Sequence, residues 1–198
     1  MSVSNKNFKF YTALLFVVTL VLVAQDLRTV GVTWDEPEAH FMASNLIIDW
    51  IAESVSRIRS GNWAGVFSPE LFQTYWPPST RETQAHLGFN DHPPLSRYLP
   101  ALTWWLFHNV FGDVESYRLS SAFLFASLVA GVFWVMSKEI GVASGLFAGI
   151  SLILMPRVFG HAHIAATDMP MTVFWFFSVT SFYRAIQGEK RWCFYFYS

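Results

Sequence analysis

The 198-residue chain is 53% hydrophobic, 18% aromatic and only 14% charged, well below the roughly 25% of charged residues in an average soluble domain. Its apolar residues form uncharged runs, which excludes a single water-soluble core with a polar shell. A net charge of −1 argues against nucleic acid as the main partner, because binding along phosphates needs an excess of Lys and Arg. The lone Cys193 excludes a disulfide framework and a cysteine-built zinc site. This composition is that of a membrane protein.

Four apolar runs are candidates for transmembrane helices, which need about 20 residues to cross roughly 30 Å of hydrocarbon. The first run follows Lys6 and Lys9, and this basic start is also typical of a cleavable signal peptide. Leu22 stands where a signal peptidase needs a small residue, which favours a retained span. The sequence therefore predicts an all-α, polytopic membrane protein with about four spans, at residues 10–26, 118–137, 140–157 and 169–186.

A fifth apolar run, residues 98–112, is short for a span and contains Pro100, His108 and Asn109. If this run does not cross, most Lys and Arg residues next to the spans fall on one side, as the positive-inside rule requires. We therefore expect an interfacial or re-entrant helix at residues 96–111. Residues 27–117 then form one long external loop, on the same side as the short connection before the last span.

Two segments of this external loop have different patterns. Residues 61–94 contain several prolines and no periodicity, which predicts an ordered but irregular loop. Residues 37–60 carry an apolar stripe at helical spacing, which predicts a helix along the membrane surface. The stripe consists of Met42, Leu46, Ile47, Trp50, Ile51, Val55 and Ile58.

The end of the chain looks like the beginning of a further apolar segment. This segment starts at Trp192 and is still unfinished at Ser198. We therefore expect the chain to be the N-terminal part of a longer protein.

Two adjacent acids, Asp35 and Glu36, follow the first span directly. Carboxylates are costly at the membrane boundary, so they indicate a function there. Either acid could act as a general base that takes a proton from a substrate hydroxyl. The alternative is structural: Glu36 would cap a helix whose first residue is Pro37, with the acids near the positive end of its dipole.

Three further residues are candidates for substrate binding. His92 precedes two prolines that fix its direction, although they also fit a simple rigid turn. Arg118 begins the longest span, at the depth where a guanidinium can grip a lipid phosphate or can snorkel without any ligand. Asp168 lies where the last span begins, which indicates a function or a helix cap.

His161 and His163 raise the question of a metal. A divalent cation held by this pair is one interpretation, and two solvated loop histidines are the other. The second is favoured, because neither Cys partners nor an H-E-x-x-H pattern accompanies the pair. The identity of any metal ligands stays unknown, and no cofactor is predicted with certainty.

The order of these motifs resembles the membrane glycosyltransferases of the GT-C class. The likeness is greatest to the protein O-mannosyltransferase and aminoarabinose-transferase group, which is of the glycosyltransferase family 39 type. It covers nearly the whole chain and implies a partial GT-C fold. The motifs that carry it are Asp35-Glu36, His92-Pro93-Pro94-Leu95, Tyr117-Arg118-Leu119-Ser120-Ser121 and Asp168-Met169-Pro170.

This resemblance implies inverting transfer of a sugar from a polyprenyl-phosphate donor to a protein, lipid or glycan hydroxyl. The reaction would take place at the extracytoplasmic face of a multi-pass protein of the cell membrane. The resemblance implies that Asp35 is the catalytic carboxylate and that Glu36 and Asp168 shape the same cavity. It further implies that Arg118 neutralises the carrier phosphate and that His92 orients a substrate or the loop.

Two other function classes compete with this hypothesis. In a polytopic transporter, Asp168 would be a substrate or proton site. The charged motifs, however, gather on one face of the membrane instead of at its midplane, and no inverted repeat is visible. A noncatalytic scaffold would have no use for Asp35 and Asp168 on the same face.

The charge distribution makes a testable prediction about topology. Asp35, His92 and Asp168 should lie outside, and Lys138 and Lys190 inside. In a variant with Cys193 replaced by Ser, an impermeant thiol reagent applied from outside should label Asp91→Cys and leave Lys138→Cys unlabelled. The opposite labelling pattern would overturn the whole arrangement.

Overall fold

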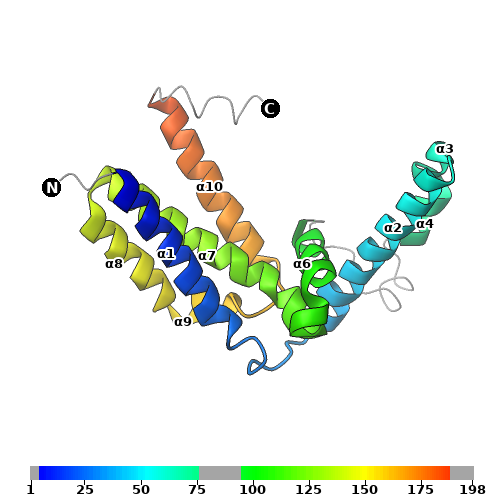
Figure 1. The fold of residues 1–198 in the computed structure, drawn as a ribbon, viewed down its shortest axis with the longest axis horizontal. Helices are drawn as coiled ribbons and strands as arrows, with labels where there is room; N and C mark the ends of the chain where they lie inside the picture. Colours follow the sequence, from blue (N-terminus) through cyan, green and yellow to red (C-terminus); the bar gives the residue numbers. More distant parts are fainter. Residues whose placement is uncertain (1–4, 76–94, 188–198) are drawn as a thin grey trace. The chain divides into compact units, whose positions relative to one another are not determined.

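The computed structural model of the protein describes residues 5–75 and 95–187. Regular structure in these ranges is helical and includes no strand, which confirms the predicted all-α class. Its elements (Figure 1) are α1 (Asn5–Ala24), the π-helical η1 (Glu36–Phe41), α2 (Met42–Arg59), α3 (Trp63–Val66), α4 (Pro69–Tyr75), α6 (Leu95–Phe111), α7 (Asp113–Glu139), α8 (Val142–Ile153), α9 (Pro156–His161) and α10 (Asp168–Ile186).

The chain forms two compact units, which are described separately. The first comprises Met1–Asp26, Ala122–Ala162 and Asp168–Ser198. The second comprises Leu27–Ser121 and His163–Thr167. The long helix α7 contributes its first part to the second unit and the rest to the first.

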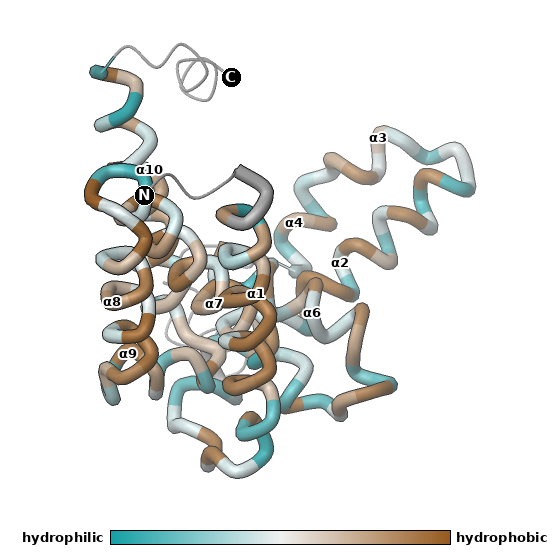
Figure 2. Tube along the Cα trace, turned by 60° about the vertical axis from the view of Figure 1, so that its left-hand side comes forward, coloured by the Kyte–Doolittle hydropathy of each residue, from teal (hydrophilic) through white to brown (hydrophobic). Residues whose placement is uncertain are grey.

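The first unit is built around the apolar part of α7. Phe125, Val129 and Phe133 of this helix are fully buried, and the ring of Phe133 stacks on that of Phe8 from α1, with 5.8 Å between their centroids. Hydrophobic residues continue along most of α1 and α8 (Figure 2). This composition is expected of helices that lie in a hydrocarbon environment.

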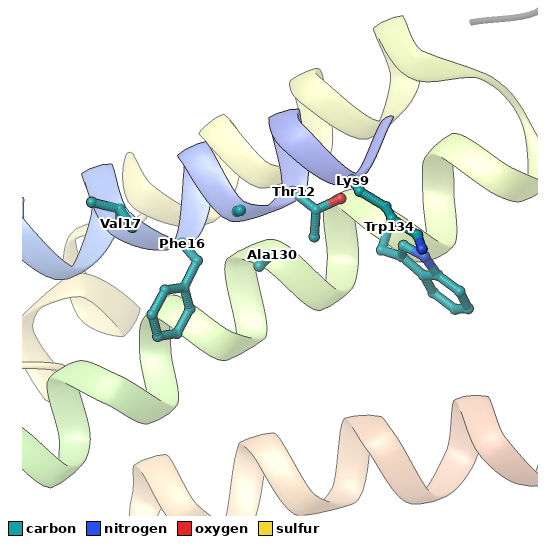
Figure 3. Close-up of a pocket in the computed structure, with 7 residues that line it drawn as sticks. Lys9, Thr12, Phe16, Val17, Ala130 and Trp134 are labelled. Atoms are coloured by element: carbon teal, nitrogen blue, oxygen red, sulfur yellow. The ribbon is translucent and has the colours of Figure 1, made fainter. Parts of the chain in front are cut away.

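An opening of about 480 Å³ lies between α1 and α7 in this unit. Phe16 of α1 and Trp134 of α7 lie at its two ends (Figure 3). Its lining is apolar apart from Lys9 and Thr12. Lys9 is the one titratable side chain in its described lining, and no carboxylate or histidine accompanies it there.

Within the described residues, α7 alone is long and apolar enough to cross a membrane by length and composition. The apolar helices Phe8–Ala24 and Val142–Ile153 are shorter. The predicted number of four spans therefore stays a prediction. The expected boundaries of the last span agree closely with those of α10, because Asp168-Met169-Pro170 is a strong helix-start signal.

The predicted span at residues 140–157 is interrupted in the structure. Helix α8 ends at Ile153, and α9 begins at Pro156. The cause is Pro156, which cannot donate a backbone hydrogen bond and holds the preceding Met155 in an extended conformation, with φ −79° and ψ 106°. The 12 residues of α8 extend only about 18 Å.

Helix α8 packs against α7 through two glycines, Gly145 and Gly149, which are its buried residues. Small residues at this spacing let two helix backbones approach closely. A Cβ atom at Gly145 would lie 2.7 Å from the backbone oxygen of Phe133. At Gly149 the nearest atom would be Cγ1 of Val129 at 3.6 Å, an ordinary contact.

The second unit is built around α2, which packs against η1 and α6 and also against α3 and α4. Residues 37–60 are helical as predicted, but only part of their apolar stripe is buried: Ile47 is fully covered, whereas Ile51 and Val55 are exposed. The prediction of an irregular loop at residues 61–94 was wrong in its first part, which holds α3 and α4. Both helices are too short to show periodicity, and Pro69 is tolerated because it is the first residue of α4.

The predicted helix at residues 96–111 is present as α6. It has 17 residues with Pro100 inside, so its length is about 25 Å. It ends at Phe111 and is followed by Gly112, whose φ of +87° favours glycine; α7 begins at the next residue. The predicted interfacial position of α6 stays a prediction.

The contact between α7 and α8 makes a prediction about stability. Gly145→Ala should lower the midpoint of thermal unfolding, because overpacking against a backbone atom costs about 1 to 3 kcal/mol. Gly149→Ala is the matched control. It should leave the midpoint unchanged or raise it, because alanine favours a helix over glycine by about 1 kcal/mol. Equal midpoints for the two variants, measured in detergent, would contradict the observed packing.

Candidate active site

A buried ion pair between Arg118 of α7 and Glu36 of η1 lies at the centre of the second unit. The side chain of Arg118 is 1% exposed and that of Glu36 is fully buried. Nε of Arg118 donates to Oε1 of Glu36 at 2.8 Å, and Nη2 donates to Oε2 at 2.7 Å. This is the two-donor geometry in which a guanidinium binds a carboxylate most strongly.

The remaining donors of Arg118 bind the chain that leads from α1 to η1. Nη1 donates to the carbonyl oxygens of Leu27 and Val30, both at 2.8 Å, and Nη2 donates to that of Gly31 at 2.9 Å. A guanidinium has five N–H donors. All five of these donors are therefore used within the protein.

The carboxylate of Glu36 is equally well bound. Besides the two bonds from Arg118, its Oε2 accepts from the backbone N–H of Thr33 at 2.9 Å and from the Thr33 hydroxyl at 3.1 Å. Its Oε1 accepts from the backbone N–H of Ala165 at 2.9 Å. The Arg118–Glu36 cluster, meaning these two side chains and their partners Leu27, Val30, Gly31, Thr33 and Ala165, ties together three distant parts of the sequence.

Complete hydrogen bonding is what makes such a buried pair tolerable. Removing two charges from water carries a large desolvation cost, which is offset only when geometry is good and the remaining donors and acceptors are satisfied. The cluster meets both conditions. Its role is therefore to hold residues 27–36 in one conformation.

Asp35 differs from its neighbour Glu36 in exposure and in hydrogen bonding. Its side chain is partly exposed and makes no hydrogen bond or ion pair with the described residues. It occupies the position before η1 without capping that helix. Its carboxylate is therefore available, and the backbone that carries it is held by Thr33 and Glu36 on either side.

The proposed capping role of Glu36 is not what the structure shows. Glu36 is the first residue of η1, and its carboxylate binds Arg118 and Thr33 instead of the N–H groups of the helix. Arg118 was expected to bind the carrier phosphate, but its guanidinium is occupied by Glu36 and by three backbone oxygens. A carrier phosphate could bind its guanidinium only by displacing one of the five acceptors that it already has.

Asp168 begins α10 in the first unit. Its side chain is 68% exposed, and Oδ2 lies 3.2 Å from Nδ1 of His161, without the alignment of a hydrogen bond. Since Asp35 belongs to the second unit, the predicted cavity shared by the two acids stays a prediction. His92 lies outside the described residues.

The structure adds little to the question of a metal. No group of three or more His, Cys, Asp or Glu side chains suited to hold one occurs within residues 5–75 and 95–187. His163, one member of the suggested pair, is buried. The protein ligands of a divalent cation therefore stay unassigned.

An aromatic stack beside the cluster was missed by the sequence analysis. The ring of Tyr117 lies between those of Phe41 and Trp104, at centroid distances of 4.6 and 5.9 Å. The Tyr117 hydroxyl donates to Oδ1 of Asn45, and Nε1 of Trp104 donates to Oδ1 of Asp113 at 2.9 Å. These contacts fix η1 and α6 against the start of α7. The only signal for them in the sequence is that Tyr117 precedes Arg118.

Comparison with known proteins decides the family. Residues 91–198 match the family described as dolichyl-phosphate-mannose-protein mannosyltransferase. The chain belongs to this family. No curated protein and no solved structure matches the chain. Membership indicates a membrane-integral glycosyltransferase of the mannosyltransferase type. The match includes Arg118 and Asp168, whereas Asp35 and Glu36 precede it.

For this member of the family, the cluster makes a prediction about Arg118. Arg118→Met should destabilise the protein by about 3 to 5 kcal/mol, because it leaves a buried carboxylate without its cation. Arg118→Lys should also destabilise it, because an ammonium offers three donors where five are needed. Thermal unfolding in detergent measures both.

The matched control is Arg28→Gln. Arg28 forms an ion pair with Glu115 at 2.9 Å, but its side chain is 69% exposed. Such a pair is worth only about 0 to 1 kcal/mol. If Arg118→Lys were as stable as the wild type and bound the donor less well, the phosphate-binding role would be supported instead of the structural one.

Proposed function

We propose that this protein transfers a sugar from a polyprenyl-phosphate donor to an acceptor hydroxyl at the extracytoplasmic membrane face, with Asp35 as the general base. The observation that carries this proposal is the contrast between two adjacent acids. Glu36 is buried and fully bound, whereas Asp35 is accessible and has no partner among the described residues. Family membership supports the reaction class.

The proposed reaction needs a base because an alcohol is a weak nucleophile. The acceptor proton would move to the Asp35 carboxylate while the acceptor oxygen forms a bond to the anomeric carbon. The bond between that carbon and the phosphate oxygen would break, and its electron pair would leave with the polyprenyl phosphate. Attack opposite the leaving group inverts the anomeric centre. General-base help of this kind requires a carboxylate within about 2.6 to 3.2 Å of the hydroxyl.

In this proposal, Arg118 and Glu36 are positioning residues. Residues that hold a catalytic group in the productive geometry contribute by preorganisation, without touching substrate. The hydrogen bonds to Thr33 and to the carbonyl oxygens of Val30 and Gly31 hold the chain immediately before Asp35. Because all five donors of Arg118 are already used, the carrier phosphate would be bound by a cation or hydrogen-bond donor other than Arg118. His92 and Asp168 stay proposed substrate-binding residues.

The transporter alternative has less support. It depends on Asp168 as a substrate or proton site within the membrane, yet this side chain is exposed and in contact with His161. The family match favours the transferase. A transporter would also leave the contrast between Asp35 and Glu36 without a purpose.

The proposal predicts that Asp35→Asn abolishes sugar transfer in a folded protein. Loss of a general base typically lowers turnover about 10²- to 10⁴-fold. The midpoint of thermal unfolding should not change, because Asp35 makes no hydrogen bond or ion pair with the part of the chain that the structure describes. The assay measures transfer from a panel of polyprenyl-phosphate sugars by the whole protein, at matched expression.

The control is Asp49→Asn, which removes an exposed carboxylate of α2 in the same unit and should leave turnover unchanged. Asp168→Asn should be as harmful as Asp35→Asn if both acids serve one cavity. Normal transfer by the Asp35→Asn variant would show that Asp35 is not the general base.

A further inference from the structure

An apolar groove of about 690 Å³ lies between α2 and α6 in the second unit. It is separate from the Arg118–Glu36 cluster, and none of its lining residues takes part in that cluster. Its α2 side extends from Ile47 to Arg59, and its α6 side from Tyr98 to Trp105.

The groove is lined by large apolar side chains that the described chain leaves uncovered. Ile51 is 45% exposed, Leu102 is 52% exposed and Trp105 is 63% exposed. Contiguous exposed apolar surface of this kind usually marks an interaction site. In a membrane-integral protein, the apolar ligand present at the highest concentration is lipid.

One cation stands among these apolar residues. Arg59, the last residue of α2, lines the groove and makes no hydrogen bond or ion pair with the described residues. Arg57, two residues earlier, is bound to Glu53 and to the carbonyl oxygen of Gly65, both at 2.8 Å. No carboxylate lines the groove within the described residues. The charge pattern therefore suits a ligand with an apolar chain and a single anionic group.

We propose that this groove binds an acyl chain of an anionic bilayer phospholipid, whose phosphate pairs with Arg59. Basic side chains near a membrane surface attract anionic headgroups, and a helix with one apolar side lies naturally at that depth. The lining favours a phospholipid over the sugar-bearing donor. Apart from Arg59, the polar groups of its described lining are the hydroxyl of Tyr98 and the indole N–H of Trp105, and sugar hydroxyls need several placed donors and acceptors.

Photo-crosslinking of the whole protein in nanodiscs tests this proposal. The probes are phosphatidylglycerol and phosphatidylcholine, each with a diazirine in one acyl chain. Phosphatidylglycerol should label peptides from both α2 and α6, at Ile51, Val55 or Leu102. Arg59→Gln should reduce this labelling about fivefold, the worth of one basic residue at an anionic surface, and should leave labelling by phosphatidylcholine unchanged.

Arg157→Gln is the matched control, because Arg157 is also exposed but lies on α9 in the first unit. It should not alter labelling of the groove. Labelling that is absent from the groove, or equal for both probes and insensitive to Arg59→Gln, would overturn the proposal. So would displacement of the probe by equimolar polyprenyl phosphate, which would assign the groove to the carrier. None of these readouts depends on sugar transfer, so failure here leaves the proposed function untouched.

Discussion

The structure of the second unit depends on the hydrogen-bonded pair of Arg118 and Glu36. A guanidinium with five donors meets five acceptors, and three of these are backbone oxygens of the chain before η1. Because both charges are buried, neither side chain can be shortened without leaving the other unsatisfied. The same pair holds Ala165 of the segment before α10. The carboxylate of Glu36 thereby joins the start of α7 and the segment before α10 to the chain before η1.

This constraint gives two neighbouring acids different environments. Glu36 supplies structure, whereas Asp35, one residue earlier, makes no hydrogen bond or ion pair with the described residues. Hydrogen bonds of Thr33 and Glu36 hold the backbone on either side of it. A catalytic carboxylate benefits from this arrangement, since its orientation is set before substrate arrives. The family match supports the transferase reaction, and the contrast between the acids is the basis for proposing Asp35 as its general base.

The sequence predicted the helical class, and it singled out Glu36 and Arg118, which form the buried pair, because charged groups beside apolar runs are conspicuous; the catalytic role of Asp35 stays a prediction. The sequence could not predict the partners of Arg118. Three of its five hydrogen bonds go to backbone oxygens, which every residue has and which no sequence pattern therefore identifies. Pro156 is visible in the sequence, but the predicted span at residues 140–157 continued past it, whereas the helix ends before it. The short α3 and α4 lack the periodicity that reveals longer helices. The start of α10 was predicted well, because Asp168-Met169-Pro170 is a local signal.

Amide hydrogen exchange of the whole protein tests the central claim most directly. Thr33 and Ala165 both donate their backbone N–H to the buried carboxylate of Glu36. In a Glu36→Ala variant, the peptides that contain these two residues should lose protection together, while peptides from α8 keep theirs. Unchanged exchange at both residues, or loss at Thr33 alone, would contradict the account in which one buried carboxylate joins the two segments.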